Sequence, residues 1–323
     1  MPDEHHDPVA WVLAENEPSL TWRVLTELQG RPSDDPEVEK ARGRIGAEGW
    51  AAKVLGEQLP SGQWDSPGTR AGELYRPKYI ATNWRLLVLS DLGVTRSNPG
   101  VERAVELLFA AHASPEGDLG GSGSETCFTG NAVRMLSRFG YAEDPRLRAA
   151  IDWLLANQKA DGGWHCWPSE TGAIDCWEPL AAFDALPRSM RTLAVERAIE
   201  RGAEFYLSKG LLGEGDEEYP PWRRMHYPVH YYYDFLVGLD TLTRLGFGRD
   251  PRLTPALNHL AQLRNSDGTW TMGPAHPDLP TSEVEYRPEP PLYPFVLEYP
   301  GRPSRWLTIT ALAVLRRAGR WNA

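Results

Sequence analysis

The sequence lacks several features that would assign it to a class at once. Its 323 residues include only three cysteines, an odd number that disfavours a disulfide framework and favours reduced thiols or metal ligands. The 34 basic residues are outnumbered by 44 acidic ones, so the clustered basic face that nucleic acids require is not expected. We therefore predict no DNA or RNA partner.

Membrane and strand signals are also scarce. No apolar run approaches the ~20 residues that a membrane-spanning helix requires. Residues 1–11 (MPDEHHDPVAW) lack the charged and apolar regions of a signal peptide. The period-two alternation that marks a β-strand is almost missing. These absences predict a cytoplasmic, all-α protein without a transmembrane segment.

Glycine and proline are abundant, at 30 and 28 residues, and they recur in a fixed order. Four junctions share one pattern, and they read Gly30-RPSDDPEV, Gly93-VTRSNPGV, Gly140-YAEDPRL and Gly246-FGRDPRL. In each junction we expect glycine to end a helix, Asp or Asn to cap the next one, and proline to occupy its first position. The four junctions predict a helical repeat.

A second motif, a small-residue turn closed by tryptophan, marks the other ends of these helices. It occurs as Leu59-PSGQW, Lys159-ADGGW and Asn265-SDGTW, with Pro115-EGDLGGS as a weaker relative. The two motifs together predict alternating helices of two classes. The less apolar, outer class covers residues 36–58, 101–112, 146–158, 191–209 and 252–264. The more apolar class, expected to be buried, covers residues 19–29, 80–92, 127–139, 176–186, 231–245 and 304–318.

Helix pairs punctuated by DGGW-type turns resemble the α/α toroid of squalene and oxidosqualene cyclases and of protein prenyltransferase β-subunits. The resemblance extends from about Pro18 to Arg317. It implies one domain over residues 1–323, an α6-α6 barrel with about six inner and six outer helices. The Pro-rich residues 273–303 are expected to form a loop at one end of the barrel. One fold hosts several reactions, so the turn motif does not define the chemistry.

In such a barrel the three cysteines converge, because the starts of inner helices share one end. Cys127 and Cys176 begin consecutive inner helices, Cys166 lies in the turn between them, and His230 begins the following inner helix. Thiolates and imidazole are the ligands that Zn²⁺ takes in tetrahedral sites, so these four residues form a candidate zinc site. His226 is the alternative imidazole ligand. The other interpretation is that the cysteines are small buried apolar residues.

Asp175 has a sharper interpretation as a general acid. Residues 174–178 (IDCWE) resemble the SDCTAE segment of oxidosqualene cyclases, which implies that Asp175 is the acid that starts the cation cascade. A carboxylic acid in a dry aromatic cavity retains its proton. The alternative interpretations make Asp175 a zinc ligand, the carboxylate that orients His230, or a helix cap. Glu178 and Asp234, the latter expected to hold the His230 ring, are further catalytic candidates.

Aromatic residues are plentiful near the same helix starts. Such rings stabilise a passing carbocation and also solvate an isoprenoid chain. The candidate substrate-binding residues are Trp84, Trp164, Trp167, Trp177, Tyr231, Tyr232, Tyr233 and Trp306. Packing between helices is the alternative interpretation for about half of them.

These features predict a terpene cyclase-like or prenyltransferase-like enzyme that acts on an isoprenoid-like apolar molecule in a central cavity, with zinc at its mouth. The first alternative is a metal-free cyclase that protonates its substrate through Asp175. The second is a non-catalytic isoprenoid carrier, or a scaffold that pairs with another subunit or with a second copy of the chain.

Overall fold

The computed structural model describes residues 7–64, 74–75, 79, 81–120, 125–213, 219–274 and 297–321. Within these residues the regular secondary structure is helical, with three isolated β-bridges and no strand. The predicted all-α class is therefore confirmed. In the same residues no helix has the length and apolar character needed to cross a bilayer.

The chain divides into two compact units. The first unit comprises residues 1–53, 212–229 and 234–323, and the second unit comprises residues 54–211 and 230–233. The single domain over residues 1–323 stays a prediction.

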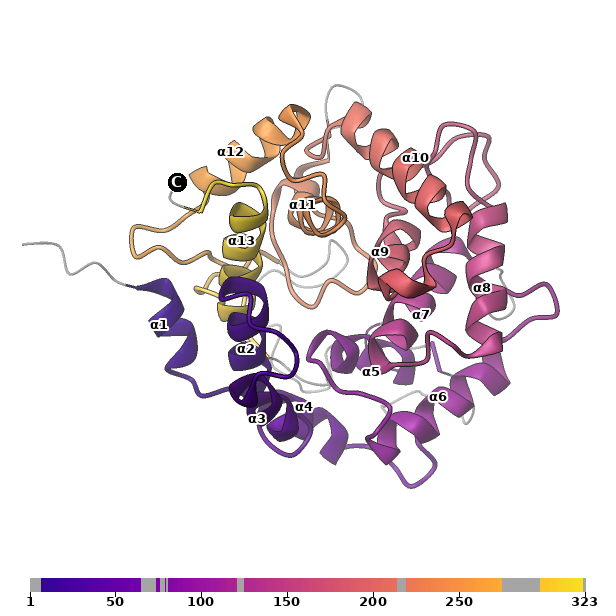
Figure 1. Cartoon of the computed structure of the whole chain (residues 1–323), viewed down its shortest axis with the longest axis horizontal. Coiled ribbons are helices and arrows are strands. Elements are labelled where there is room, and N and C mark those ends of the chain that lie inside the picture. Colours follow the sequence, from indigo (N-terminus) through magenta and orange to yellow (C-terminus); the bar gives the residue numbers. More distant parts are fainter. Residues whose placement is uncertain are drawn as a thin grey trace, which may run out of the picture. The chain divides into compact units, whose positions relative to one another are not determined.

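The second unit is built from inner and outer helices (Figure 1). They are α5 (Thr82–Asp91), α6 (Pro99–His112), α7 (Thr126–Phe139), α8 (Pro145–Ala156), α9 (Glu178–Ala185), the 3₁₀ turn η3 (Arg188–Met190) and α10 (Leu193–Lys209). α7 packs against both α5 and α9, and each of these inner helices contacts the outer helix that follows it. The inner helices are buried along most of their residues, whereas α6, α8 and α10 bury one face. The predicted inner and outer classes are confirmed.

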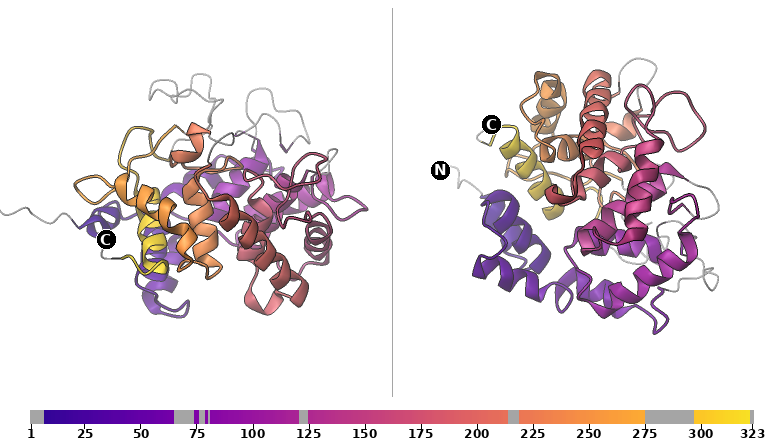
Figure 2. Two further views of the ribbon diagram at one scale, coloured as in Figure 1. Left: turned by 90° about the horizontal axis from the view of Figure 1, so that it is seen from above. Right: turned by 45° about the vertical axis from the view of Figure 1, so that its right-hand side comes forward.

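The first unit repeats the same pairing (Figure 2). Its elements are α1 (Pro8–Leu13), α2 (Pro18–Arg23), the π-helical η1 (Val24–Leu28), α3 (Pro36–Arg44), η5 (Pro220–Arg223), α11 (Phe235–Arg244), η6 (Pro251–Leu253), α12 (Thr254–Gln262) and α13 (Arg305–Arg317). The helix α4 (Gly49–Gly56) has residues in both units. α13 contacts α11, α2 and η1. The outer helix α12 packs on α11, and the outer helix α3 packs on α2.

The four predicted junctions are formed as the sequence indicates. A side-chain oxygen accepts a hydrogen bond from the backbone N–H two residues later at Asp35, Asn98, Asp144 and Asp250. The preceding helices end at residues with φ between 69° and 101°, which are Gly30, Gly93, Gly140 and Gly246. Glycine adopts this left-handed conformation without steric cost, which explains why the pattern repeats.

The tryptophan turns also recur in the structure. In three turns a fully buried indole N–H donates to the carbonyl ten residues earlier, on the preceding outer helix. The pairs are Trp64 with Val54 (2.6 Å), Trp164 with Leu154 (2.9 Å) and Trp270 with Leu260 (2.8 Å). Each turn therefore holds the end of its own outer helix.

Some predicted boundaries were wrong. Residues 36–58 form α3 and α4 rather than one helix, because Gly46 in the intervening turn has a φ of 90°. The predicted helix 19–29 is α2 followed by the π-helical η1. The helix α1 was not predicted. Within the predicted loop 273–303, residues 275–296 lie outside the described part of the chain.

Candidate active site

The candidate site lies where α7 and α9 pack together in the second unit. Gly130 on α7 makes this close approach possible, since a Cβ there would lie 2.7 Å from backbone atoms of Glu178 and Pro179. The first turn of α9 rests directly on α7 as a result. This contact positions the Glu178 side chain beside α7.

The three cysteines lie together next to this contact. The Cys166 and Cys176 sulfurs are 3.4 Å apart, and Cys127 hydrogen bonds with Cys166. Cys176 is buried, whereas Cys127 and Cys166 are half-buried. The hydrogen bond with Cys166, together with burial, raises the pKa of the Cys127 thiol. At neutral pH Cys127 is therefore a neutral thiol.

Glu178 brings a buried carboxyl group to the same place. Its side chain has no exposed surface, and neither carboxyl oxygen has a hydrogen-bond partner among the described residues. Burial raises the pKa of Glu178 well above its ordinary value, nearby Cys127 acts in the same direction, and Arg134 opposes them. The protonated, neutral form of this carboxyl group is therefore favoured to a higher pH than in an exposed glutamate.

Arg134 supplies a buried positive charge that the sequence analysis missed. Its guanidinium carbon lies 4.9 Å from the centre of the Trp177 ring, and its Nη1 is 4.0 Å from a carboxylate oxygen of Asp91. Arg138 pairs with the same carboxylate. An arginine in the middle of an apolar inner helix is the signal that could have identified it, because a buried charge requires partners.

Asp175 does not occupy the dry environment that was predicted for it. Its side chain is exposed. It is also not the cap of α9, because the N-cap residue is Trp177, which makes no side-chain capping bond. The helix begins two residues later than predicted, at Glu178. The buried carboxyl group that we predicted at Asp175 is therefore found at Glu178 instead.

A cluster of aromatic rings forms the other part of the site. His230 stacks on Tyr79, with 5.4 Å between the ring centres, and meets the Trp84 ring edge-on at 5.3 Å. The Tyr79 and Tyr231 hydroxyls are 3.0 Å apart. The Trp177 indole donates to the Tyr231 carbonyl at 3.2 Å, which connects the cluster to the start of α9.

Two residues of this cluster have strained backbones. The φ values are 65° at Tyr79 and 50° at His230, in the left-handed region that residues with a Cβ seldom adopt. Each such conformation costs on the order of 1–3 kcal/mol, and strain of this kind gathers at functional sites. The two strained residues stack on each other, so one contact helps to hold both.

The predicted aromatic candidates separate into different environments. Trp84, Trp177 and Tyr231 belong to the ring cluster, and Tyr232 stacks on Tyr231 with ring centres 4.7 Å apart. These four residues remain candidates for contact with an apolar molecule.

The other four candidates do not join this cluster in the same way. Trp164 is buried in its turn, and Tyr233 donates to the Leu211 carbonyl at 3.0 Å. Trp167 is 67% exposed. Trp306 belongs to the first unit, where it stacks on Tyr227. Packing or solvent explains the environment of each.

Asp234 holds His226 rather than His230. The His226 Nδ1 is 2.7 Å from the Asp234 carboxylate, and the His226 backbone N–H donates to it at 3.1 Å. The same carboxylate caps α11 by accepting from the Val237 N–H at 2.9 Å. The expectation that Asp234 would hold the His230 ring assumed that both residues lie in one helix. It was wrong because α11 begins only at Phe235, after both of them.

The predicted zinc ligands do not form one group in the structure. Among the described residues, no set of three or more His, Cys, Asp and Glu side chains is arranged to hold a metal ion. His230 contacts aromatic rings, whereas Cys127, Cys166 and Cys176 contact one another. In the described structure the four predicted ligands are therefore not gathered around one point. Zinc binding stays a prediction.

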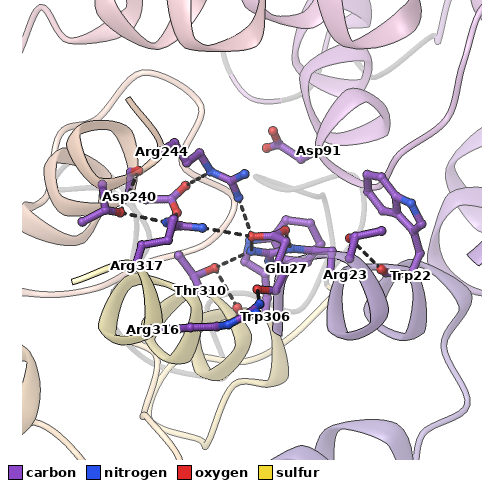
Figure 3. Close-up of polar contacts among 12 residues, drawn as sticks. Trp22, Arg23, Glu27, Asp91, Asp240, Arg244, Trp306, Thr310, Arg316 and Arg317 are labelled. Carbon is purple, nitrogen blue, oxygen red and sulfur yellow. Dashed lines mark hydrogen bonds and ion pairs between the residues drawn. The ribbon is translucent and has the colours of Figure 1, made fainter. Parts of the chain in front are cut away.

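The first unit contains a cluster of ion pairs that joins three inner elements (Figure 3). Glu27 on η1 pairs with Arg23 and with Arg244 on α11. Asp240 pairs with Arg244 at 3.0 Å and with Arg317 on α13. Burial tends to raise the pKa of Glu27, but Arg23 and Arg244 outweigh burial and hold it below its ordinary value. Asp240 thus has the partners that a buried carboxylate requires.

Comparison with known proteins gives a partial match in sequence. No family model matches the chain. Over 143 residues it is 25% identical to the squalene–hopene cyclase of Zymomonas mobilis subsp. mobilis. This match covers 43% of the chain and 21% of the cyclase, so the chain matches about a fifth of that enzyme's length. It confirms the resemblance to terpene cyclases that the turn motifs predicted.

Two solved structures are similar over most of the chain. One is a variant of the type II terpene cyclase MstE from Scytonema in complex with its substrate, geranylgeranyl dihydroxybenzoate. It has 17% identity and a TM-score of 0.48, and the match covers 97% of this chain and 96% of that one. The other is a polysaccharide lyase with 12% identity and a TM-score of 0.49, covering 97% and 96%.

Proposed function

We propose that the protein is an enzyme that protonates an apolar, isoprenoid-like molecule, with Glu178 as the proton donor. The observation that carries this proposal is the fully buried carboxyl group whose two oxygens have no partner among the described residues. A polar group left in this way costs roughly 1–3 kcal/mol of stability. Such exceptions in folded proteins call for an explanation, and a catalytic role supplies one.

The chemistry requires only groups that lie at this site. The O–H bond of Glu178 breaks, a C–H bond forms on a carbon of a substrate double bond, and a carbocation results beside the new carboxylate. Arg134 favours that carboxylate, since it lowers the pKa of Glu178. The neighbouring Trp177 ring favours the cation through its π-electrons. Loss of a proton from the product cation returns Glu178 to its neutral form.

The substrate class rests on a second observation. The sequence similarity to a squalene–hopene cyclase supports an isoprenoid-like molecule over other apolar compounds. The ring cluster around Tyr79 and Trp84 offers the apolar, electron-rich surface that such a chain requires.

The test replaces the acid by its isosteric amide. We expect turnover in a screen of isoprenoid alcohols, hydrocarbons and diphosphates of increasing length. Glu178→Gln should bind the same compound, but its turnover should fall by the ~10² to 10⁴ typical of a lost general acid. Asp175→Asn is the matched control: its carboxylate is exposed three residues away, and its turnover should stay close to that of the wild type.

Two results would contradict the proposal. One is normal turnover by Glu178→Gln on a substrate that the wild type converts. The other is tight binding of an isoprenoid by the wild type with no conversion, which would identify a carrier instead of an enzyme.

A further inference from the structure

Two of the three thiols, those of Cys166 and Cys176, are almost close enough to form a disulfide. The sulfurs of Cys166 and Cys176 are 3.4 Å apart, and a disulfide requires about 2.0 Å. An approach of about 1.4 Å would therefore join them. Both side chains belong to the second unit, and the ten-residue separation of the two cysteines closes only a short loop.

Neither Cys166 nor Cys176 lies within a regular helix. Cys166 lies in the irregular residues 164–177, and Cys176 lies two residues before α9 begins. Cys127, in contrast, is held in the first turn of α7. The pair formed by Cys166 and Cys176 is thus the one that side-chain rotation and a small loop shift can close.

We propose that Cys166 and Cys176 form a reversible modification site, which becomes a disulfide when the protein meets a peroxide and returns to two thiols when two molecules of an external thiol are oxidised to their own disulfide. One thiolate attacks a peroxide oxygen, the O–O bond breaks, and a sulfenic acid and one water result after proton transfer. The second thiol then attacks that sulfur, an S–S bond forms, and a second water leaves. Two thiols are oxidised and one peroxide is reduced. This inference does not depend on the proposed function.

Cys127 gives the site a third thiol. Cys127 hydrogen bonds with Cys166, but it is a neutral thiol at neutral pH, so its attack on that sulfur in the finished disulfide should be slow. The Cys166 hydrogen bond lowers the pKa of the Cys176 thiol, but burial together with the nearby Glu178, Cys127 and Asp175 outweighs it, and the pKa is raised to about 11. Oxidation should consequently be slower than at an exposed cysteine with an ordinary pKa.

Peptide mapping of the folded full chain tests the pairing directly. The protein is treated with hydrogen peroxide, blocked with N-ethylmaleimide and digested with trypsin without reduction. No Lys or Arg lies in residues 160–187, so the proposed disulfide gives one peptide that lacks two hydrogens and carries no maleimide. A bond to Cys127 would instead join that peptide to residues 104–134. Further cleavage of this peptide after Glu170 gives two fragments that stay linked while the disulfide is intact and separate once it has been reduced.

Single-thiol variants provide the controls. Cys127→Ser should still form the disulfide within one peptide, and it should melt at a higher temperature when oxidised than when reduced, because the cross-link restricts the unfolded chain. Cys176→Ser should not form that product. If Cys176→Ser fails to fold, as judged by circular dichroism, the Cys127→Ser result decides alone.

The inference is overturned if all three thiols of the oxidised, folded protein still react with maleimide. It is also overturned if the disulfides found connect different copies of the chain, or if urea-unfolded protein gives the same product in the same yield.

Discussion

At the scale of single residues, Glu178 couples the stability of the protein to pH. Burial raises its pKa above the ordinary value of 4.5 in the folded state. Above that ordinary value the folded state therefore holds a proton that the unfolded state has lost. The free energy of unfolding then decreases as the pH rises toward the folded pKa, by at most about 1.4 kcal/mol per pH unit for this group.

Glu178→Gln removes this titration and gives a prediction that needs no substrate. Relative to the wild type, the variant should gain stability as the pH rises above about 5, and it should show no such gain below about pH 4. Urea unfolding at a series of pH values measures the difference. Asp175→Asn keeps the Glu178 carboxyl group and should retain most of the wild-type pH dependence, because burial raises the pKa of Glu178 more than the Asp175 charge does. Parallel curves for Glu178→Gln and the wild type would show that the carboxyl group is not held neutral.

The sequence predicted capping residues such as Asp35 and Asp144 correctly because a cap depends only on its nearest neighbours. The choice between Asp175 and Glu178 could not be made in this way. It depends on the residue at which α9 begins and on the close approach of α9 to Gly130 of α7, which lies far away in the sequence. For the same reason, the local spacing assigned Asp234 to the wrong histidine.

At the scale of elements, the contact between α7 and α9 depends on a missing side chain. Gly130→Ala should destabilise the protein by ~1–3 kcal/mol, since its new Cβ would meet the backbone of Glu178 and α9 must move away. Gly43→Ala on α3 is the matched control. Its Cβ would meet nothing within 4 Å, so we expect a gain of roughly 0.4–1 kcal/mol. Equilibrium unfolding in urea measures both changes, and a neutral Gly130→Ala would contradict the close contact.

Helix pairs were predictable because each one carries its own start and stop signals along the chain. The break within residues 36–58 was less visible, since glycines inside an otherwise helical pattern are often tolerated. The π-helical η1 had no signal of its own. Its turn brings Glu27 to Arg244, a residue more than two hundred positions away.

At the scale of the whole molecule, groups with opposite pKa shifts shape the dependence of stability on pH. The pKa values of Glu27 and Asp240 are held below their ordinary values of 4.5 and 3.8 by the surrounding arginines, despite burial. Their contribution is therefore complete above those values and is lost as the pH falls below them. Since Glu178 acts in the opposite direction, we expect the greatest stability at mildly acidic pH.

Glu27→Gln tests the acidic side of this profile. At neutral pH the variant should lose ~3–5 kcal/mol, because it leaves the buried Arg23 without a carboxylate partner among the described residues and removes one of the two carboxylates that pair with Arg244. The loss should shrink as the pH falls below about 4, where Glu27 of the unfolded wild type takes up a proton while the folded protein still holds the carboxylate. Urea unfolding at several pH values measures it. A loss that is the same at every pH would exclude an ionic origin.

The indole hydrogen bonds of Trp64, Trp164 and Trp270 each reach back only ten residues. A contact between near neighbours requires little loop closure, so it forms early and at small entropic cost. Contacts of low sequence separation accompany fast folding. Each helix pair can therefore be completed while the rest of the chain is still unfolded, for instance during synthesis on the ribosome, in the order in which the turns emerge.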